Sequence, residues 1–138
     1  MTNSLTHRPG YALRRASHAM MSELARRLAE IDLRISEASI LLFVDQRADV
    51  TASEIGRTLD IQRANMVPLL NRLENAGLIE RRPLDGKSQA VLLTEAGQAR
   101  RQEADRITDQ FESDLMELVP PQSRAGFVSA LNALWQVE

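Results

Sequence analysis

Apolar side chains recur every three or four residues along most of this chain, a spacing that predicts helices with one buried face. A first long helix is expected from Tyr11 to about Leu33. Its apolar stripe consists of Leu13, Ala16, Met20, Leu24, Leu28 and Ile31. Ser36 is then expected to cap a short helix that ends near Val44, with an incomplete capping box because Ser39 stands where an acid is preferred. This short helix is apolar nearly all round, which predicts that it forms the buried centre of the domain.

Two further helical patterns follow, separated by only three residues. Thr51 or Ser53 can cap the first, whose apolar positions are Ala52, Ile55 and Leu59. The second begins near Arg63, carries Met66, Leu69, Leu70, Leu73 and Ala76, and is ended by Gly77. Residues 78–82 and 89–93 then have the composition of short strands, joined by a turn around Asp85-Gly86. Two helices with a tight turn, followed by a hairpin, predict a winged helix-turn-helix.

The last third of the chain again has a helical spacing. Thr94 is expected to cap a helix that extends to about Val119, and Pro120-Pro121 should end it. A final helix is expected to start at Gln122 or Ser123 and to carry Phe127, Leu131, Leu134 and Trp135. A winged helix is complete with three helices and its hairpin, so the apolar stripes of the first and last helices need another surface to cover them. We expect two copies to interleave these helices in a twofold homodimer, and a bundle within one chain is the alternative.

The predicted fold class is therefore mainly α, with a small β-wing. Residues 1–34 form an N-terminal segment and dimerisation helix, residues 35–100 the winged helix-turn-helix region, and residues 101–138 the C-terminal dimerisation helices.

Composition narrows the possible functions. The chain of 138 residues has no cysteine, which excludes disulfides, thiol redox sensing and thiolate metal sites. No apolar run approaches the roughly 20 residues of a membrane span, so we expect a cytoplasmic protein without a membrane partner. The formal net charge of −2 is unevenly distributed, with 0 on residues 1–61, +3 on residues 62–101 and −5 on residues 102–138. Positive charge thus gathers on the predicted winged helix, as expected for a nucleic-acid interface.

The outward face of the second helix of this unit is polar and offers groups that can recognise base pairs. We predict that this helix contacts DNA through Arg63, Ala64, Asn65, Val67, Pro68, Asn71 and Arg72. Asparagine pairs with adenine, arginine with guanine or phosphate, and small apolar groups contact the thymine methyl. Pro68 cannot donate a hydrogen bond to the carbonyl of Ala64, so we expect either a bend there or a later start of the helix.

The hairpin offers a second set of candidate DNA contacts, Arg81, Arg82, Asp85, Lys87 and Ser88. A basic side chain at the tip of a hairpin can enter the minor groove or contact phosphates. We expect Asp85 mainly to stabilise the turn by bonding its own backbone, and also to orient Lys87.

These segments, in this order, resemble the MarR (multiple antibiotic resistance regulator) family of bacterial transcription factors. The matching segments are residues 52–59, 73–79, 85–88 with Arg81, and Leu93-Thr94-Glu95-Ala96-Gly97. The resemblance implies a triangular dimer that represses genes until a small anionic or aromatic compound binds between the dimerisation helices and the winged helix. Two departures stand out. Lys87 occupies the place of the family's wing arginine and lacks its planar fork, and Val67 and Pro68 stand where polar or basic residues are usual.

The leading hypothesis is therefore a sequence-specific DNA-binding regulator, most simply a repressor released by a small organic ligand; activation stays open. A winged-helix module for protein contacts, without DNA affinity, is the alternative. We expect no enzyme, no cofactor and no metal, because two histidines, no cysteine and no glycine-rich phosphate loop leave little to build such a site. Candidate ligand-binding residues are Tyr11, Arg14, Arg15 and His18, which could line a pocket for an anion or simply form a solvated helix face or a dimer contact.

Overall fold

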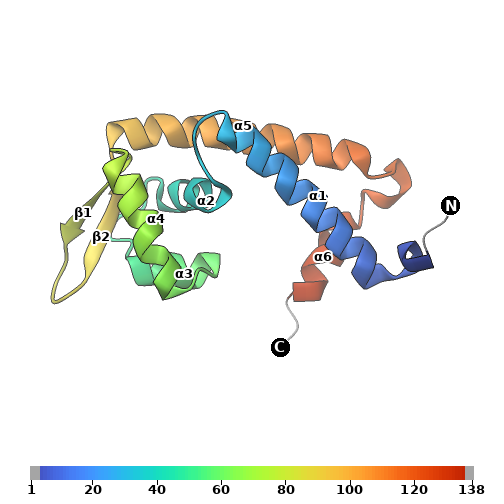
Figure 1. Ribbon diagram of the computed structural model, residues 1–138, viewed down its shortest axis with the longest axis horizontal. Helices are drawn as coiled ribbons and strands as arrows, with labels where there is room; N and C mark the ends of the chain where they lie inside the picture. Colours follow the sequence, from blue (N-terminus) through green and yellow to red (C-terminus); the bar gives the residue numbers. More distant parts are fainter. Residues whose placement is uncertain (1–3, 136–138) are drawn as a thin grey trace.

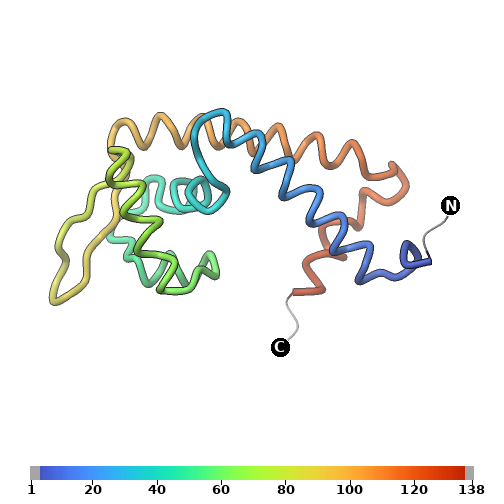
Figure 2. Tube along the Cα trace, viewed as in Figure 1, coloured from blue at the N-terminus to red at the C-terminus, as the bar shows by residue number. Residues whose placement is uncertain are grey.

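The computed structural model describes residues 4–135 and confirms a mainly helical fold with a two-stranded wing (Figure 1). The elements in chain order are η1 (Ser4–His7), α1 (Pro9–Ala29), α2 (Ile35–Val44), α3 (Ala52–Leu59), α4 (Arg63–Asn75), β1 (Ile79–Pro83), β2 (Gln89–Leu93), α5 (Glu95–Leu118), η2 (Pro121–Ser123) and α6 (Phe127–Trp135). The helices α2, α3 and α4 and the wing form a unit at one end, and α1 and α6 lie at the other (Figures 1 and 2). The long helix α5 joins the two ends. No helix among the described residues is long and apolar enough to cross a lipid bilayer.

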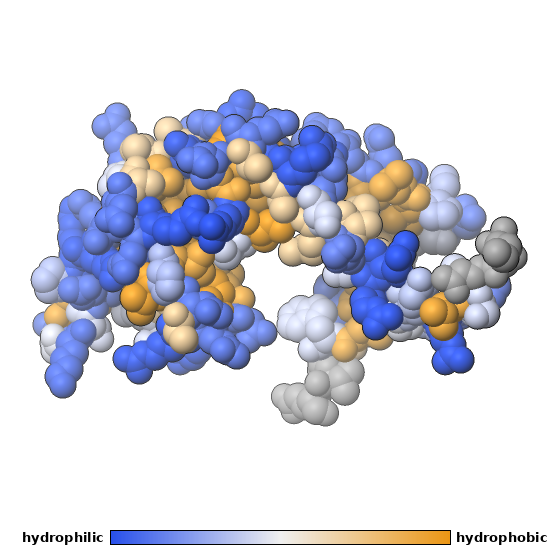
Figure 3. All heavy atoms as spheres, in the orientation of Figure 1, coloured by the Kyte–Doolittle hydropathy of each residue, from blue (hydrophilic) through white to orange (hydrophobic). Residues whose placement is uncertain are grey.

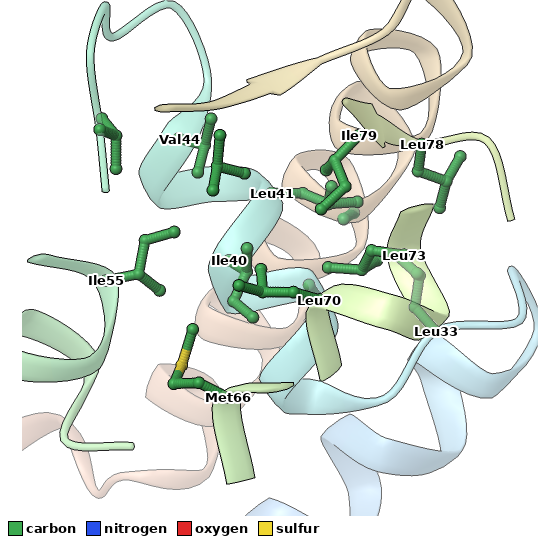
Figure 4. Packing of buried hydrophobic residues seen from close by; sticks show 14 of the residues in the cluster. Leu33, Ile40, Leu41, Val44, Ile55, Met66, Leu70, Leu73, Leu78 and Ile79 are labelled. Atoms are coloured by element: carbon green, nitrogen blue, oxygen red, sulfur yellow. The ribbon is translucent and has the colours of Figure 1, made fainter. Parts of the chain in front are cut away.

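Helix α2 is the buried centre of the winged-helix unit, as its sequence predicts. Its side chains Ala38, Ile40, Leu41 and Val44 are almost completely buried. Around it, α3, α4, β1 and the segment before β1 contribute to a single apolar cluster, which also includes residues of α1, β2 and α5 (Figure 4). Because α2 also packs against α1 and α5, it connects the winged-helix unit to the rest of the chain.

Local signals end and start the helices around this core. Thr51 and Thr94 cap α3 and α5, and their hydroxyls accept hydrogen bonds from the backbone N–H groups of Glu54 and Gly97 at 3.2 Å and 3.0 Å. Gly77, with φ of +76°, ends α4, as expected. These three positions fix the ends of the elements that carry the predicted interface.

The wing is an antiparallel pair in which Ile79 lies opposite Leu93 and Pro83 opposite Gln89. Its turn is closed by a 2.9 Å hydrogen bond from the Leu84 N–H to the Ser88 carbonyl. The segment before α3 adds to the hairpin, because the Val50 carbonyl accepts a 2.7 Å hydrogen bond from the Val91 N–H. The wing is therefore attached to the helix-turn-helix along its inner edge.

Three predicted boundaries are wrong. Helix α1 ends at Ala29 rather than near Leu33, because the chain turns at Asp32 with φ of +57°. The cap of α2 is Arg34 rather than Ser36, since the Glu37 carboxylate accepts the Arg34 N–H and fixes a start two residues earlier.

The third wrong boundary is the start of the final helix, which lies at Phe127 rather than at Gln122 or Ser123. The Arg124 guanidinium donates to the Val119 and Glu117 carbonyls, at 2.8 Å and 3.1 Å, and holds this segment in a separate short turn.

Candidate nucleic-acid interface

Helix α4 turns one face to the core and the other to solvent. Met66, Leu70 and Leu73 are buried against the α2 cluster. The opposite face is exposed and includes all seven residues predicted from the sequence for this helix, Arg63, Ala64, Asn65, Val67, Pro68, Asn71 and Arg72. Val67 is 56% exposed at its place on this face. An apolar group held in solvent at the N-terminal end of this helix suits contact with a thymine methyl.

Pro68 lies inside α4, which runs without interruption from Arg63 to Asn75. The alternative that the helix starts after Pro68 is therefore wrong. Because proline has no N–H, the Ala64 carbonyl receives no hydrogen bond from it, and one rung of the helix is missing on the exposed face.

Basic side chains surround the hollows between α3, α4 and the wing. Arg57, Arg63 and Arg81 line one hollow together with the buried edge of α4, and Arg63, Arg81 and Lys87 line its neighbour toward the wing. Arg57 and Ser53 were not identified as interface residues from the sequence, although both lie on α3 beside α4 and line the first hollow. Ser53 and Arg57 are four residues apart, which places them on one face of α3, and this spacing was the available signal. Each hollow is thus lined by three cations, an arrangement suited to bind phosphate groups.

The predicted cations differ in whether they are already paired. Within the described residues, the side chains of Arg63 and Lys87 form no hydrogen bond or ion pair. Arg72 instead pairs with Glu37, at 3.4 Å from its Nε to the carboxylate, and Arg82 pairs with Glu80 at 2.7 Å.

Arg81 is bound to side chains of α4 rather than directed to solvent. Its guanidinium donates to the Asn71 side-chain oxygen at 2.8 Å, and its Nε lies 3.3 Å from the Glu74 carboxylate. Two residues predicted as separate DNA contacts, Asn71 and Arg81, thus bind each other and link the wing to α4.

The tip of the wing is exposed at Asp85, Lys87 and Ser88. Gly86 has φ of +76°, in agreement with the predicted Asp-Gly turn. The Asp85 side chain, however, makes no hydrogen bond with its own backbone in the described structure, because the turn is closed by the backbone bond between Leu84 and Ser88. Asp85 is left as a free carboxylate beside Lys87.

The candidate ligand residues lie in the first half of α1, on a largely exposed part of that helix. Arg14 and Arg15 lie over the ring of Tyr11, with their guanidinium carbons 5.7 Å and 6.0 Å from its centre. His18 is exposed further along the same helix. The structure thus brings three of the four residues into contact, on the outer helices and away from the winged helix.

The clear pKa shifts among the described residues lie between α1 and α5, not at the basic hollows. Hydrogen bonds from Arg26 and Arg27 lower the pKa of Glu23 to about 2. Hydrogen bonds from Gln110 and Arg27 lower the pKa of Asp114. The candidate interface instead depends on the positive charges of its arginines and of Lys87.

Comparison with known proteins agrees with this geometry. Residues 31–89 match the model of the MarR family. A transcriptional repressor, CouR, solved with a 23-mer DNA duplex is 31% identical, with 97% of this chain and 96% of that chain covered and a TM-score of 0.86. CouR bound to p-coumaroyl-CoA is 29% identical, with 100% and 99% covered and a TM-score of 0.85. The HTH-type transcriptional repressor Rv2887 of Mycobacterium tuberculosis is 25% identical over 118 residues, which cover 83% of this chain and 85% of that protein.

Proposed function

This chain belongs to the MarR family of winged helix-turn-helix transcription regulators, and we propose that it represses transcription by binding a specific duplex operator as a homodimer. Members of this family are regulators and not enzymes, which agrees with the expectation from the sequence. The observation that carries the proposal is the exposed N-terminal half of α4, where unpaired Arg63 lines both basic hollows and Asn65 is exposed with a free side chain.

The N-terminal half of α4 enters the major groove in this proposal. Asn65 then faces a base edge, and Val67 with Pro68 contacts thymine methyl groups. Lys87, at the tip of the wing, contacts phosphates or the adjacent minor groove. Arg57 and Arg63, around the hollow between α3 and α4, hold the backbone of the same duplex.

Exposed apolar side chains on the outer helices support a dimer. Large apolar side chains that remain exposed there are Leu5, Leu13, Met21, Leu118, Val128, Leu134 and Trp135. Helix α6 buries none of its side chains within the chain, although most of them are apolar. A second copy that interleaves α1, α5 and α6 covers these surfaces and sets two α4 helices on successive turns of the duplex, about 34 Å apart.

We further propose that an aromatic acyl thioester or a similar aromatic anion releases the operator. CouR, which shares the fold over its whole length, is described as bound to p-coumaroyl-CoA. The first 22 residues carry three arginines and two histidines but no acidic residue, so the N-terminal part of α1 is suited to bind phosphate groups. A concavity separates the winged-helix unit from the outer helices and offers room for the acyl group (Figure 3).

The test begins with selection of duplexes from fragments of the source genome, followed by fluorescence anisotropy on the enriched duplex and a scrambled one at several salt concentrations. The proposal expects tight binding to the enriched duplex alone, with a steep decrease in affinity as salt increases. Arg63→Gln should weaken binding, and Glu112→Gln, an exposed change on α5, serves as the matched control. Failure to enrich any duplex contradicts the proposal and favours a winged-helix module for protein contacts.

The effector is tested on the same duplex. p-Coumaroyl-CoA should release the protein, whereas coenzyme A alone should not. Arg15→Ala should reduce release without a change in DNA affinity. Equal loss of release and of DNA affinity would indicate damage to the dimer instead.

A further inference from the structure

Glu37 is the one charged side chain buried in the core of residues 4–135, with 3% of its surface exposed. It stands in the first turn of α2, beside the apolar cluster. A carboxylate loses its hydration on burial, and that loss is large unless partners replace the water. The contacts of Glu37 therefore indicate why a charge is held at this place.

The two oxygens of the Glu37 carboxylate have different partners. One accepts the backbone N–H of Arg34 at 2.8 Å and so fixes the start of α2. The other lies 3.4 Å from Nε of Arg72, in the second half of α4. A single carboxylate thus joins the central helix of the core to the helix predicted to contact DNA.

Arg72 is 44% exposed on its side chain, but its guanidinium is directed to Glu37. On the other flank of the same helix, Asn71 and Glu74 hold Arg81 of the wing. The second half of α4 is therefore fixed on both sides by ion pairs and hydrogen bonds, whereas Arg63 and Asn65 in its first half have free side chains.

We propose that Glu37 is a positioning residue that sets the orientation of α4 on α2 through Arg72, and that Arg72 does not itself contact DNA. This inference rests on the proposed function. Replacement of a buried ion pair by apolar residues is often neutral for stability, so orientation accounts better than stability for a charge held here. Helix α2 also packs against α1 and α5, so the Glu37–Arg72 pair couples the position of these outer helices to that of α4.

The two possible roles of Arg72 predict opposite effects of Glu37→Gln on DNA affinity. Glu37→Gln keeps an oxygen that accepts the Arg34 N–H but removes the charge opposite Arg72. If the pair positions α4, Glu37→Gln misplaces a base contact and weakens binding to the specific duplex by about tenfold. If Arg72 were a phosphate contact, the loss of its acidic partner would free it and strengthen binding to every duplex.

Anisotropy on the specific and the scrambled duplex, at several salt concentrations, separates these roles. We expect Glu37→Gln and Arg72→Gln each to weaken specific binding by about tenfold, and the double variant to be no weaker than either, because they break one pair. The dependence on salt should be unchanged, and the Glu112→Gln control should behave as the parent. Tighter binding by Glu37→Gln, or a salt slope about one unit smaller in Arg72→Gln, would overturn the proposal.

Hydrogen exchange of the α4 amides without DNA tests the positioning independently of the proposed function. Glu37→Gln should speed exchange in α4 and leave α6 unchanged. If Glu37→Gln does not fold, Arg72→Gln, a change at a partly exposed side chain, breaks the same pair and should likewise speed exchange in α4. If the parent does not discriminate between duplexes, the proposed function fails, while the exchange rates still decide the role of Glu37. Unchanged exchange in α4 rejects it.

Discussion

The winged-helix unit and the outer helices use the same apolar spacing in different ways. In α2, Ile40 and Leu41 are fully buried by other parts of the same chain. In α6, Leu134 and Trp135 are 60% and 72% exposed, although this helix is as apolar as a core helix. The comparison shows that periodicity identifies which face of a helix is to be covered but not which molecule covers it. The winged-helix unit is complete within one chain, and the outer helices are completed, in our proposal, by a second.

The largest loss of stability is expected from a cavity in the core of the winged-helix unit, the half that is complete within one chain. Ile40→Ala should lower the free energy of unfolding by about 4 kcal/mol, because the side chain is fully enclosed and its surroundings cannot collapse around it. Urea unfolding measures this change, and Leu134→Ala in α6 is the matched substitution. A similar loss for both variants in the isolated monomer would contradict the division into a complete and an incomplete half.

A smaller loss is expected where the wing meets α5. An added methyl group at Gly97 would lie 1.9 Å from the Leu78 carbonyl oxygen, so the backbone just before β1 must move away from α5. Gly97→Ala should therefore cost about 3 kcal/mol. Gly10, with open space around it, provides the control for the added methyl group in a helix. Thermal unfolding of both variants checks the prediction.

Substitutions in the outer helices should change the self-association of the chain rather than the folding of the monomer. Leu134→Glu places a charge in the proposed dimer interface and should weaken dimerisation by at least about tenfold. Sedimentation equilibrium measures this change. Ser129→Glu adds the same charge to α6 about 140° around the helix axis and should have a smaller effect. A chain that remains monomeric at all concentrations in the parent would favour a bundle within one chain.

The smallest effect concerns the contact between α1 and α5, within the outer helices. Glu23 binds Arg26 and Arg27, and Arg27 also pairs with Asp114 at 2.9 Å. The pKa of Glu23 falls from 4.5 to about 2, so its contribution to stability is present above pH 4.5 and is lost as the pH falls to about 2. Glu23→Gln should flatten the decrease in melting temperature over this window. An unchanged pH profile would show that the cluster is unimportant for folding.

Much of the fold could be predicted because the signals are local. Thr51 and Thr94 cap helices through groups three residues away, and Gly77 ends α4 by its own backbone conformation. The start of α2 was predicted wrongly, because serine is a favoured N-cap residue and Ser36 precedes an apolar run. The actual start is set by the Glu37 carboxylate, which accepts the Arg34 N–H. Pro68 could not be placed for a similar reason, since packing of Met66 and Leu70 keeps α4 continuous despite the missing hydrogen bond.

By itself, the sequence determined the order of the helices and strands, the buried face of each, and the polar outer face of α4. These depend on side chains within one or two turns of each other. The tertiary structure alone decided which cations are free. Arg72 meets Glu37 and Arg81 meets Asn71 only because α2, α4 and the wing pack at particular angles, which no local spacing records. Ion pairs between elements depend on the orientation of whole helices, and that orientation is a property of the packed core.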